Sequence, residues 1–256
     1  MHPAAICALP RRARFLLIAV LLLGSSSASP GQGTGQPSQI RPLGPAGMPA
    51  QFFPLPHRPV AGIVAEEWAT EEARDRDGEA EQIMNFLGVG PGMTVADLGA
   101  GAGYYTVRLA KRVGPTGRVL AEDVVPAYLA KLRERVSREH LDNVTLVLGE
   151  PHDPRLPFHS VDLVLMAHMY HEVAQPYGLL FNLLPALRPG ARVAVIDLDQ
   201  PTEQHGTPHL LLLCEFHSLG FRQTNWGWMR GNKEYFGLFQ PPSQPPKHEA
   251  IVPCSQ

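Results

Sequence analysis

The chain has 256 residues, of which 44% are hydrophobic and 18% charged, and its formal net charge is −2 at pH 7. This length and apolar fraction fit one folded domain of ordinary size with additional segments at its ends. The near-neutral balance, without a basic stripe, argues against nucleic acid as a partner, and three cysteines are too few for a disulfide framework.

The N-terminus has the pattern of an export signal. Arg11, Arg12 and Arg14 precede an apolar run at 15–23, and small residues suited to a cleavage site follow it. Residues 1–28 are therefore expected to be a signal peptide, and the protein is expected to be periplasmic or secreted. The apolar run is short for a transmembrane helix, so contact with a membrane is expected only if the signal stays uncleaved. A membrane-anchored or cytoplasmic protein is the alternative.

Proline-rich segments flank the central part of the chain. Residues 29–62 are rich in proline, glycine and glutamine without a hydrophobic period, which is typical of a disordered linker. Residues 241–256 are also proline-rich and are expected to form an irregular C-terminal tail. The folded domain is thus predicted at 63–240. Cys214 lies in this domain and Cys254 in the tail, and the sequence leaves open whether they pair.

Strand and helix patterns alternate through the folded domain. Apolar runs predict strands at 94–98, 118–123, 143–148, 161–166 and 191–198. Apolar spacing predicts helices after the charged run 66–77, at 104–113, from Pro126 onward, at 179–187 and at 207–219. This alternation indicates an α/β fold, a Rossmann-like doubly wound sheet that is mostly parallel. The final strands, at 221–228 and 234–239, have no helix between them, so one of them is expected to be antiparallel.

A glycine-rich loop joins the first strand to the following helix. It contains Gly99, Gly101 and Gly103, and Asp97 lies near the end of the strand. Ligands of doubly wound sheets bind at the carboxyl ends of strands, where glycines let the backbone approach them closely. The dinucleotide pattern Gly-x-Gly-x-x-Gly fails here because residue 104 is Tyr. A tight turn without a ligand is the alternative interpretation.

An acidic residue ends the second strand. The carboxylate of Asp123 is placed to accept hydrogen bonds from both hydroxyls of a ribose. Glu122 is the neighbouring alternative. Because side chains alternate along a strand, only one of the two is expected to face the ligand, and Asp123 is favoured.

Residues 83–240 resemble the class I S-adenosylmethionine-dependent methyltransferases, in particular a bacterial subgroup of often exported members. The resemblance is carried by the segments at 95–105, 117–123, 153–157, 162–165, 169–172 and 187–190. It implies a seven-stranded sheet with the last strand antiparallel and S-adenosyl-L-methionine as cofactor. It also implies that Asp123 binds the cofactor's ribose. The set of motifs does not specify an acceptor.

The resemblance assigns further roles around the cofactor. It implies that Asp97 and the loop 99–103 hold the amino acid end. Tyr104, directly after the loop, is expected to line the cofactor pocket. An acidic side chain after the third strand is implied near the adenine amine, and both Glu150 and Asp153 fall in that loop. Which of the two carboxylates does this stays open.

His168, His171 and Glu172 follow the fourth strand, at a position that faces the transferred methyl group in this fold. Methyl transfer needs in-line positioning and, for a hydroxyl or amine acceptor, removal of a proton. His168 or His171 is therefore a candidate general base that Glu172 would orient. Alternatively, these residues hold the following loop and catalysis relies on proximity alone. No metal site is expected, because the His-x-x-His-Glu spacing lacks the zinc-protease form.

The sequence thus predicts a methyltransferase that uses S-adenosyl-L-methionine and acts on a small-molecule acceptor, because little chain is left for a separate substrate domain. The alternative is a non-catalytic protein that binds this cofactor or another nucleotide on the same fold. Export favours this alternative, since the cofactor is made in the cytosol. The intact Asp97, glycine loop and Asp123 argue against it.

Overall fold

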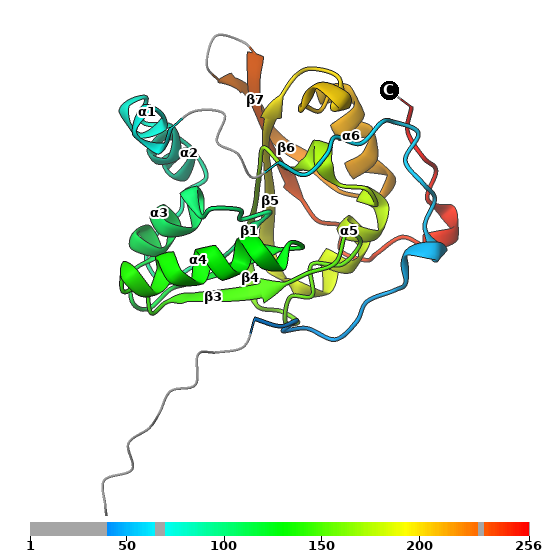
Figure 1. Ribbon diagram of the computed structural model, residues 1–256. Helices are drawn as coiled ribbons and strands as arrows, with labels where there is room; N and C mark the ends of the chain where they lie inside the picture. The colour runs from blue at the N-terminus through cyan, green and yellow to red at the C-terminus, as the bar shows by residue number, and fades with distance from the viewer. Residues whose placement is uncertain (1–39, 65–69, 230–232, 256) are drawn as a thin grey trace, which may run out of the picture. The chain divides into compact units, whose positions relative to one another are not determined.

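The computed structural model describes residues 40–64, 70–229 and 233–255 (Figure 1). The predicted signal peptide and the first part of the predicted linker lie outside these residues. Within the described part of the chain, no helix combines the length and apolar character that a membrane span requires.

The described strands form one sheet in the order β3-β2-β1-β4-β5-β7-β6. β1 to β5 are parallel to one another, whereas β7 pairs antiparallel with both β5 and β6. The predicted mostly parallel sheet with an antiparallel terminal strand is therefore confirmed. Its strands are β1 (Thr94–Leu98), β2 (Arg118–Asp123), β3 (Val144–Leu148), β4 (Val161–Ala167), β5 (Leu187–Leu198), β6 (Arg222–Met229) and β7 (Glu234–Gln240).

Helices cover both faces of this sheet, because successive strand residues point to opposite sides. Ala96 and Leu98 of β1 pack in a cluster with residues of α5 and α6, whereas Val95 packs with α2 and α3 (Figure 1). The α-helices are α1 (Glu71–Arg76), α2 (Glu79–Phe86), α3 (Tyr104–Val113), α4 (Pro126–Arg138), α5 (Pro176–Leu183) and α6 (His209–Ser218). The short 3-10 helices are η1 (Ala50–Phe52), η2 (Tyr170–Glu172), η3 (Leu184–Ala186), η4 (Thr202–Gln204) and η5 (His248–Ala250).

The boundary between α5 and β5 differs from the prediction. The helix expected at 179–187 ends at Leu183, and β5 starts at Leu187, before the Pro189–Gly190 turn that was expected to separate them. The pairing of β5 with β4 shifts register between Val161 and Leu163. This bulge accommodates the proline, which has no N–H to donate to the ladder.

Residues 40–64, called here the N-terminal strap, pack against the domain. Arg41 bridges to Val147 of β3, and the Phe53 ring is buried in the core. The Arg58 Nε atom lies 2.9 Å from Glu215 Oε1 in an ion pair whose side chains are fully buried. For residues 40–62, the described part of the segment 29–62, the structure therefore differs from the expected disordered linker. Its contacts join residues more than a hundred positions apart, so no local pattern announces them.

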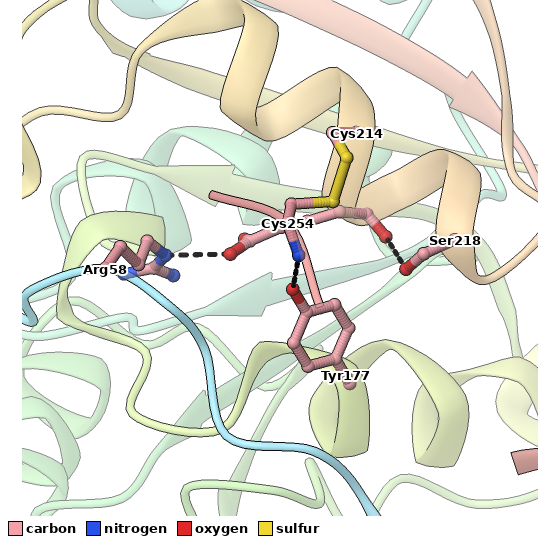
Figure 2. Close-up of a disulfide and its surroundings, with 6 residues drawn as sticks. Arg58, Tyr177, Cys214, Ser218 and Cys254 are labelled. Carbon is pink, nitrogen blue, oxygen red and sulfur yellow. Dashed lines mark hydrogen bonds and ion pairs between the residues drawn. A yellow bond between two sulfur atoms is a disulfide. The ribbon is translucent and has the colours of Figure 1, made fainter. Parts of the chain in front are cut away.

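A disulfide fixes the C-terminal tail. Cys254 is bonded to Cys214 of α6, 40 residues earlier in the chain (Figure 2). The Cys254 N–H also donates to the Tyr177 hydroxyl at 2.7 Å. The tail, expected to be irregular, contains only the short η5 among its described residues, yet it is held firmly at this point.

Candidate active site

The three glycines of the β1–α3 loop differ in what surrounds them. All have positive φ, at +66° for Gly99, +50° for Gly101 and +86° for Gly103. A Cβ at Gly103 would lie 2.3 Å from Leu132 Cδ1, so this glycine lets α3 and α4 pack closely. A Cβ at Gly101 would meet nothing nearer than the Gly99 carbonyl oxygen, at 4.0 Å. Gly101 therefore faces open space in which a ligand can approach the backbone.

A cavity of about 140 Å³ lies beside this loop at the carboxyl ends of β1, β2 and β4. Its wall brings together six of the predicted site residues: Gly99, Gly101, Asp123, Glu150, His168 and Glu172. Ile63 and Val64 of the strap form part of the same wall. The remaining predicted residues do not line the cavity: Asp97, Gly103, Tyr104, Asp153 and His171.

Asp123 supports the glycine loop directly. Its carboxylate accepts the Gly101 N–H at 2.9 Å and the Val125 N–H at 2.8 Å. Burial raises the pKa of Asp123, although these backbone donors favour the ionised form. Two backbone bonds leave acceptor capacity on the carboxylate, so binding of ribose hydroxyls remains chemically possible.

Glu122 also lines the cavity, contrary to the expectation that only one of the two acidic residues would face it. Burial, together with the charge of Asp123, raises the pKa of Glu122 well above its usual range. Among the described residues, the buried Glu122 Oε1 atom has no hydrogen-bond partner. Strand alternation does not separate the two residues, because β2 ends at Asp123 and the backbone turns there.

Asp97 lies behind the glycine loop. Its carboxylate accepts the Thr106 hydroxyl at 2.6 Å, and burial raises its pKa to about 7. Tyr104 points elsewhere, because its hydroxyl donates to Asp75 of α1 at 3.2 Å and the Arg74 guanidinium lies 3.5 Å from its ring centre. The structure thus connects Tyr104 with α1 instead of the cavity.

The two acidic residues of the loop after β3, Glu150 and Asp153, differ in exposure and in their contacts. Glu150 lines the cavity with 45% of its side chain exposed, and it pairs with Arg155 at 2.7 Å. The Asp153 side chain is only 4% exposed and accepts the Gly47 N–H of the strap at 2.7 Å. Of the two, Glu150 is therefore the one available to a ligand.

His168 is held in the cavity wall by contacts on two sides. Its backbone adopts a φ of +55°, and its N–H donates to the Ile196 carbonyl at 2.8 Å. Its Nε2 atom lies 2.9 Å from Glu234 Oε1 at the start of β7. Burial disfavours the imidazolium, but the Glu234 hydrogen bond and nearby carboxylates outweigh it and raise the pKa of His168.

His171 and Glu172 of η2 face different surroundings. The His171 side chain is fully buried, and its Nδ1 atom lies 3.0 and 3.1 Å from the two Asp197 carboxylate oxygens. Glu172 lines the cavity and accepts the Val64 N–H at 3.0 Å. Burial raises the pKa of Glu172 to about 7. His168 and Glu172 therefore reach the cavity, and His171 does not.

Sequence reasoning missed several residues around the site. Asp197 ends the buried run of β5, a position that could have signalled a functional carboxylate at the carboxyl edge of the sheet. Glu234 opens β7 and reaches His168 only because β7 pairs antiparallel with β5. Ile63 and Val64 carry no motif, so nothing in the sequence marks them as part of the cavity wall.

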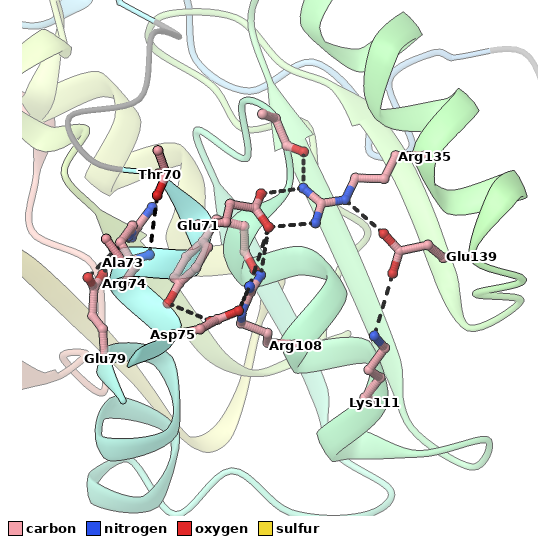
Figure 3. A network of polar contacts seen from close by, with 12 residues as sticks. Thr70, Glu71, Ala73, Arg74, Asp75, Glu79, Arg108, Lys111, Arg135 and Glu139 are labelled. Atoms are coloured by element: carbon pink, nitrogen blue, oxygen red, sulfur yellow. Dashed lines mark hydrogen bonds and ion pairs between the residues drawn. The ribbon is translucent and has the colours of Figure 1, made fainter. Parts of the chain in front are cut away.

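The acidic helix α1 docks beside the glycine loop (Figure 3). Glu71 pairs with Arg135 of α4 at 2.5 Å, and Asp75 pairs with Arg108 of α3. Arg135 also donates to the Ala102 carbonyl within the loop, at 2.9 Å. The acidic residues of α1 therefore fix this helix to α3, α4 and the loop.

Comparisons with known proteins agree with this geometry. Residues 95–190 match the model of a family described as methyltransferase domain. An arsenite methyltransferase from Halobacterium salinarum is 35% identical over 115 residues, which cover 45% of this chain and 29% of that protein. The ubiquinone/menaquinone biosynthesis C-methyltransferase UbiE of Ectopseudomonas mendocina is 30% identical over 139 residues, covering 54% and 53%. The chain thus spans between about a third and about half the length of these curated relatives.

A solved structure extends the similarity to the whole fold. The crystal structure of a SAM-dependent methyltransferase from Aquifex aeolicus superposes with a TM-score of 0.60 at 25% identity. The match covers 67% of this chain and 98% of the Aquifex chain. The similarity therefore extends over nearly the whole Aquifex protein and is not limited to the region of the glycine loop.

Proposed function

We propose that this chain is a class I S-adenosylmethionine-dependent methyltransferase, which transfers the cofactor's methyl group to a small-molecule acceptor. One observation carries the proposal: a single cavity joins the open side of Gly101 and Asp123 to His168 and Glu172. Gly101 and Asp123 lie at the carboxyl edge of the sheet, where nucleosides bind in doubly wound folds. His168 and Glu172 can exchange protons with an acceptor.

The residues present fit this cofactor. Gly101 offers backbone without side-chain obstruction, Asp123 offers acceptors for ribose hydroxyls, and Glu150 stands on the wall for the adenine amine. Asp97, behind the loop, supplies negative charge near the expected amino acid end. When bound, S-adenosyl-L-methionine supplies a sulfonium methyl group that an acceptor displaces directly.

We infer that the strap moves when the cofactor and the acceptor bind. Binding pockets for molecules of this size hold about 300–1,000 Å³, and the cavity has about 140 Å³. Ile63 and Val64 close one side, held by the bond from the Val64 N–H to Glu172. We therefore expect this end of the strap to swing outward on binding, and then to exclude water from the bound ligands.

We assign proton removal to His168. Its Nε2 atom is held by Glu234, so a proton taken from an acceptor hydroxyl or amine creates an imidazolium that this carboxylate stabilises. The same cavity wall contains the apolar side chains of Met169, Val173 and Leu179. This lining supports an acceptor with an apolar body and one nucleophilic group. The names of the curated relatives give different methyl acceptors, so these relatives do not specify the acceptor of this chain.

We also propose that the protein is exported. The charged and apolar N-terminal pattern supports a signal peptide. The Cys214–Cys254 disulfide adds support, because disulfides persist mainly in oxidising compartments such as the periplasm. Detection of a shortened chain starting near residue 29 in the periplasmic fraction would test this, and full-length protein in the cytosol would contradict it.

Calorimetric titration of disulfide-bonded protein lacking residues 1–28 tests the main proposal. S-adenosyl-L-methionine and S-adenosylhomocysteine should bind, and NAD should not. The proposal would be refuted if neither S-adenosyl-L-methionine nor S-adenosylhomocysteine binds. Methyl release to a panel of hydroxyl, amine and thiol acceptors then separates an enzyme from a non-catalytic cofactor-binding protein. His168→Gln should lower turnover far more than cofactor affinity, whereas equal losses would indicate a structural role.

A further inference from the structure

We propose that His171, Glu172 and His205 bind one divalent transition-metal ion, with Zn²⁺ the ion that best fits these donors. Two imidazoles and one carboxylate are a donor set that zinc uses in proteins. No metal site was expected from the sequence, because the spacing His-x-x-His-Glu lacks the zinc-protease form. In the structure, the second histidine comes from a distant segment, directly after η4.

The ligand atoms of these three residues converge. All lie within 4.8 Å of one another, and His171 Nε2 is 4.0 Å from Glu172 Oε1. Donors around a tetrahedral Zn²⁺, at bond lengths of about 2.0–2.2 Å, lie roughly 3.3–3.6 Å apart. Each donor therefore has to move by less than about 1 Å to coordinate a shared ion.

Asp197 directs His171 toward this cluster. Its two carboxylate oxygens lie 3.0 and 3.1 Å from His171 Nδ1, which turns Nε2 toward Glu172. The Thr207 hydroxyl and the Leu198 N–H donate to the same carboxylate at 2.7 and 2.9 Å. A carboxylate that fixes the second nitrogen of a histidine is the usual outer support of a metal-bound imidazole.

A neighbouring cluster of similar composition lacks this arrangement. Glu79, His168 and Glu234 also bring their ligand atoms within 4.8 Å. Glu79, however, is bonded to Arg74 at 2.5 Å and to the Tyr105 hydroxyl at 2.8 Å. A guanidinium therefore already supplies positive charge there, so we assign the ion only to the cluster of His171, Glu172 and His205. The contrast provides an internal control.

The proposal does not depend on the methyltransferase activity, and its test is metal binding. Chelator-treated, disulfide-bonded protein is titrated with Zn²⁺ by calorimetry and with Co²⁺ by visible absorption. One ion per chain should bind, with a Co²⁺ spectrum typical of tetrahedral coordination. Zn²⁺ should also raise the melting temperature. No saturable binding of either ion would overturn the proposal, whatever the outcome of the cofactor titration.

Variants separate this site from other metal-binding positions. His205→Asn, in a loop, and Glu172→Gln should each weaken Zn²⁺ binding by about 100-fold or more, and Asp197→Asn by about 10–100-fold. His168→Gln, from the neighbouring cluster, should bind Zn²⁺ like the wild type. Circular dichroism confirms that each variant is folded. Wild-type affinity in both His205→Asn and Glu172→Gln, or an equal loss in His168→Gln, would refute the assignment.

Discussion

Substitution of Gly101 separates cofactor binding from folding. Its φ of +50° means that alanine pays the left-handed conformational cost, about 1–2 kcal/mol. The added methyl group overlaps with nothing, because the nearest atom is the Gly99 carbonyl oxygen at 4.0 Å. The same methyl group projects into the space expected for the cofactor. We therefore expect Gly101→Ala to fold, and to lose at least tenfold in cofactor affinity, about 1.4 kcal/mol.

Gly103→Ala is the matched control in the same loop. Its Cβ would lie 2.3 Å from Leu132 Cδ1, so overpacking of about 1–3 kcal/mol adds to a similar conformational cost. Gly103 does not line the cavity. This variant should lose more stability than Gly101→Ala, and less cofactor affinity once it is folded.

Two measurements test whether Gly101→Ala and Gly103→Ala differ in stability and in cofactor affinity as expected. Urea unfolding gives the free energy of unfolding, and calorimetry gives the affinity for S-adenosyl-L-methionine and S-adenosylhomocysteine. The reasoning fails if Gly101→Ala binds both compounds like the wild type, because the cofactor then does not approach the loop at that residue. It also fails if Gly101→Ala is the less stable of the two.

Three further predictions concern acid residues and the disulfide. Asp123→Ala should weaken cofactor binding by about 1–3 kcal/mol in calorimetry, with Glu122→Gln affecting it less; the reverse order would transfer the ribose role to Glu122. Reduction of Cys214–Cys254 should lower the free energy of unfolding by about 4 kcal/mol, from loop-closure entropy over its 40-residue separation. Urea unfolding with and without reductant measures this, and Cys254→Ser should be insensitive to reductant. The pKa of Asp97, raised to about 7, leaves its carboxyl partly protonated at pH 6.5, and the stability it contributes at low pH is lost as pH rises through 7. Binding of the cationic cofactor should therefore lower this pKa and make Asp97 release a proton to the buffer. The heat of binding should then depend on the buffer, and Asp97→Asn should abolish this dependence; equal heats in all buffers would contradict the prediction.

The alternation of strands and helices could be predicted because the sequence patterns that indicate each element are local. Each pattern spans only a few residues of sequence, as in the apolar run Thr94–Leu98, the first-turn Pro126 and the glycine loop. Gly101 and Asp123, the site residues that follow directly from this framework, line the cavity.

The rest depends on contacts between distant segments. Tyr104 was expected to line the pocket, yet its hydroxyl and ring contact α1, whose docking is decided by ion pairs such as Glu71–Arg135. Glu150 and Asp153 are both carboxylic acids, but the Asp153 carboxylate accepts the N–H groups of Gly47 in the strap and of Arg155. His205 meets His171 only after the chain folds. No periodicity in the sequence encodes such pairings.

The buried Arg58–Glu215 pair has a practical consequence for recombinant fragments. A fragment cut at the predicted domain limits, 63–240, would leave the fully buried Glu215 carboxylate unpaired, a change that costs about 3–5 kcal/mol. It would also delete Cys254 and with it the crosslink to α6. We therefore expect a fragment that keeps the strap and the tail to be more stable than one cut at 63–240. The region matched by the family model, 95–190, contains neither Arg58 nor either of the two bonded cysteines, so a fragment cut at those limits would lack both of these links.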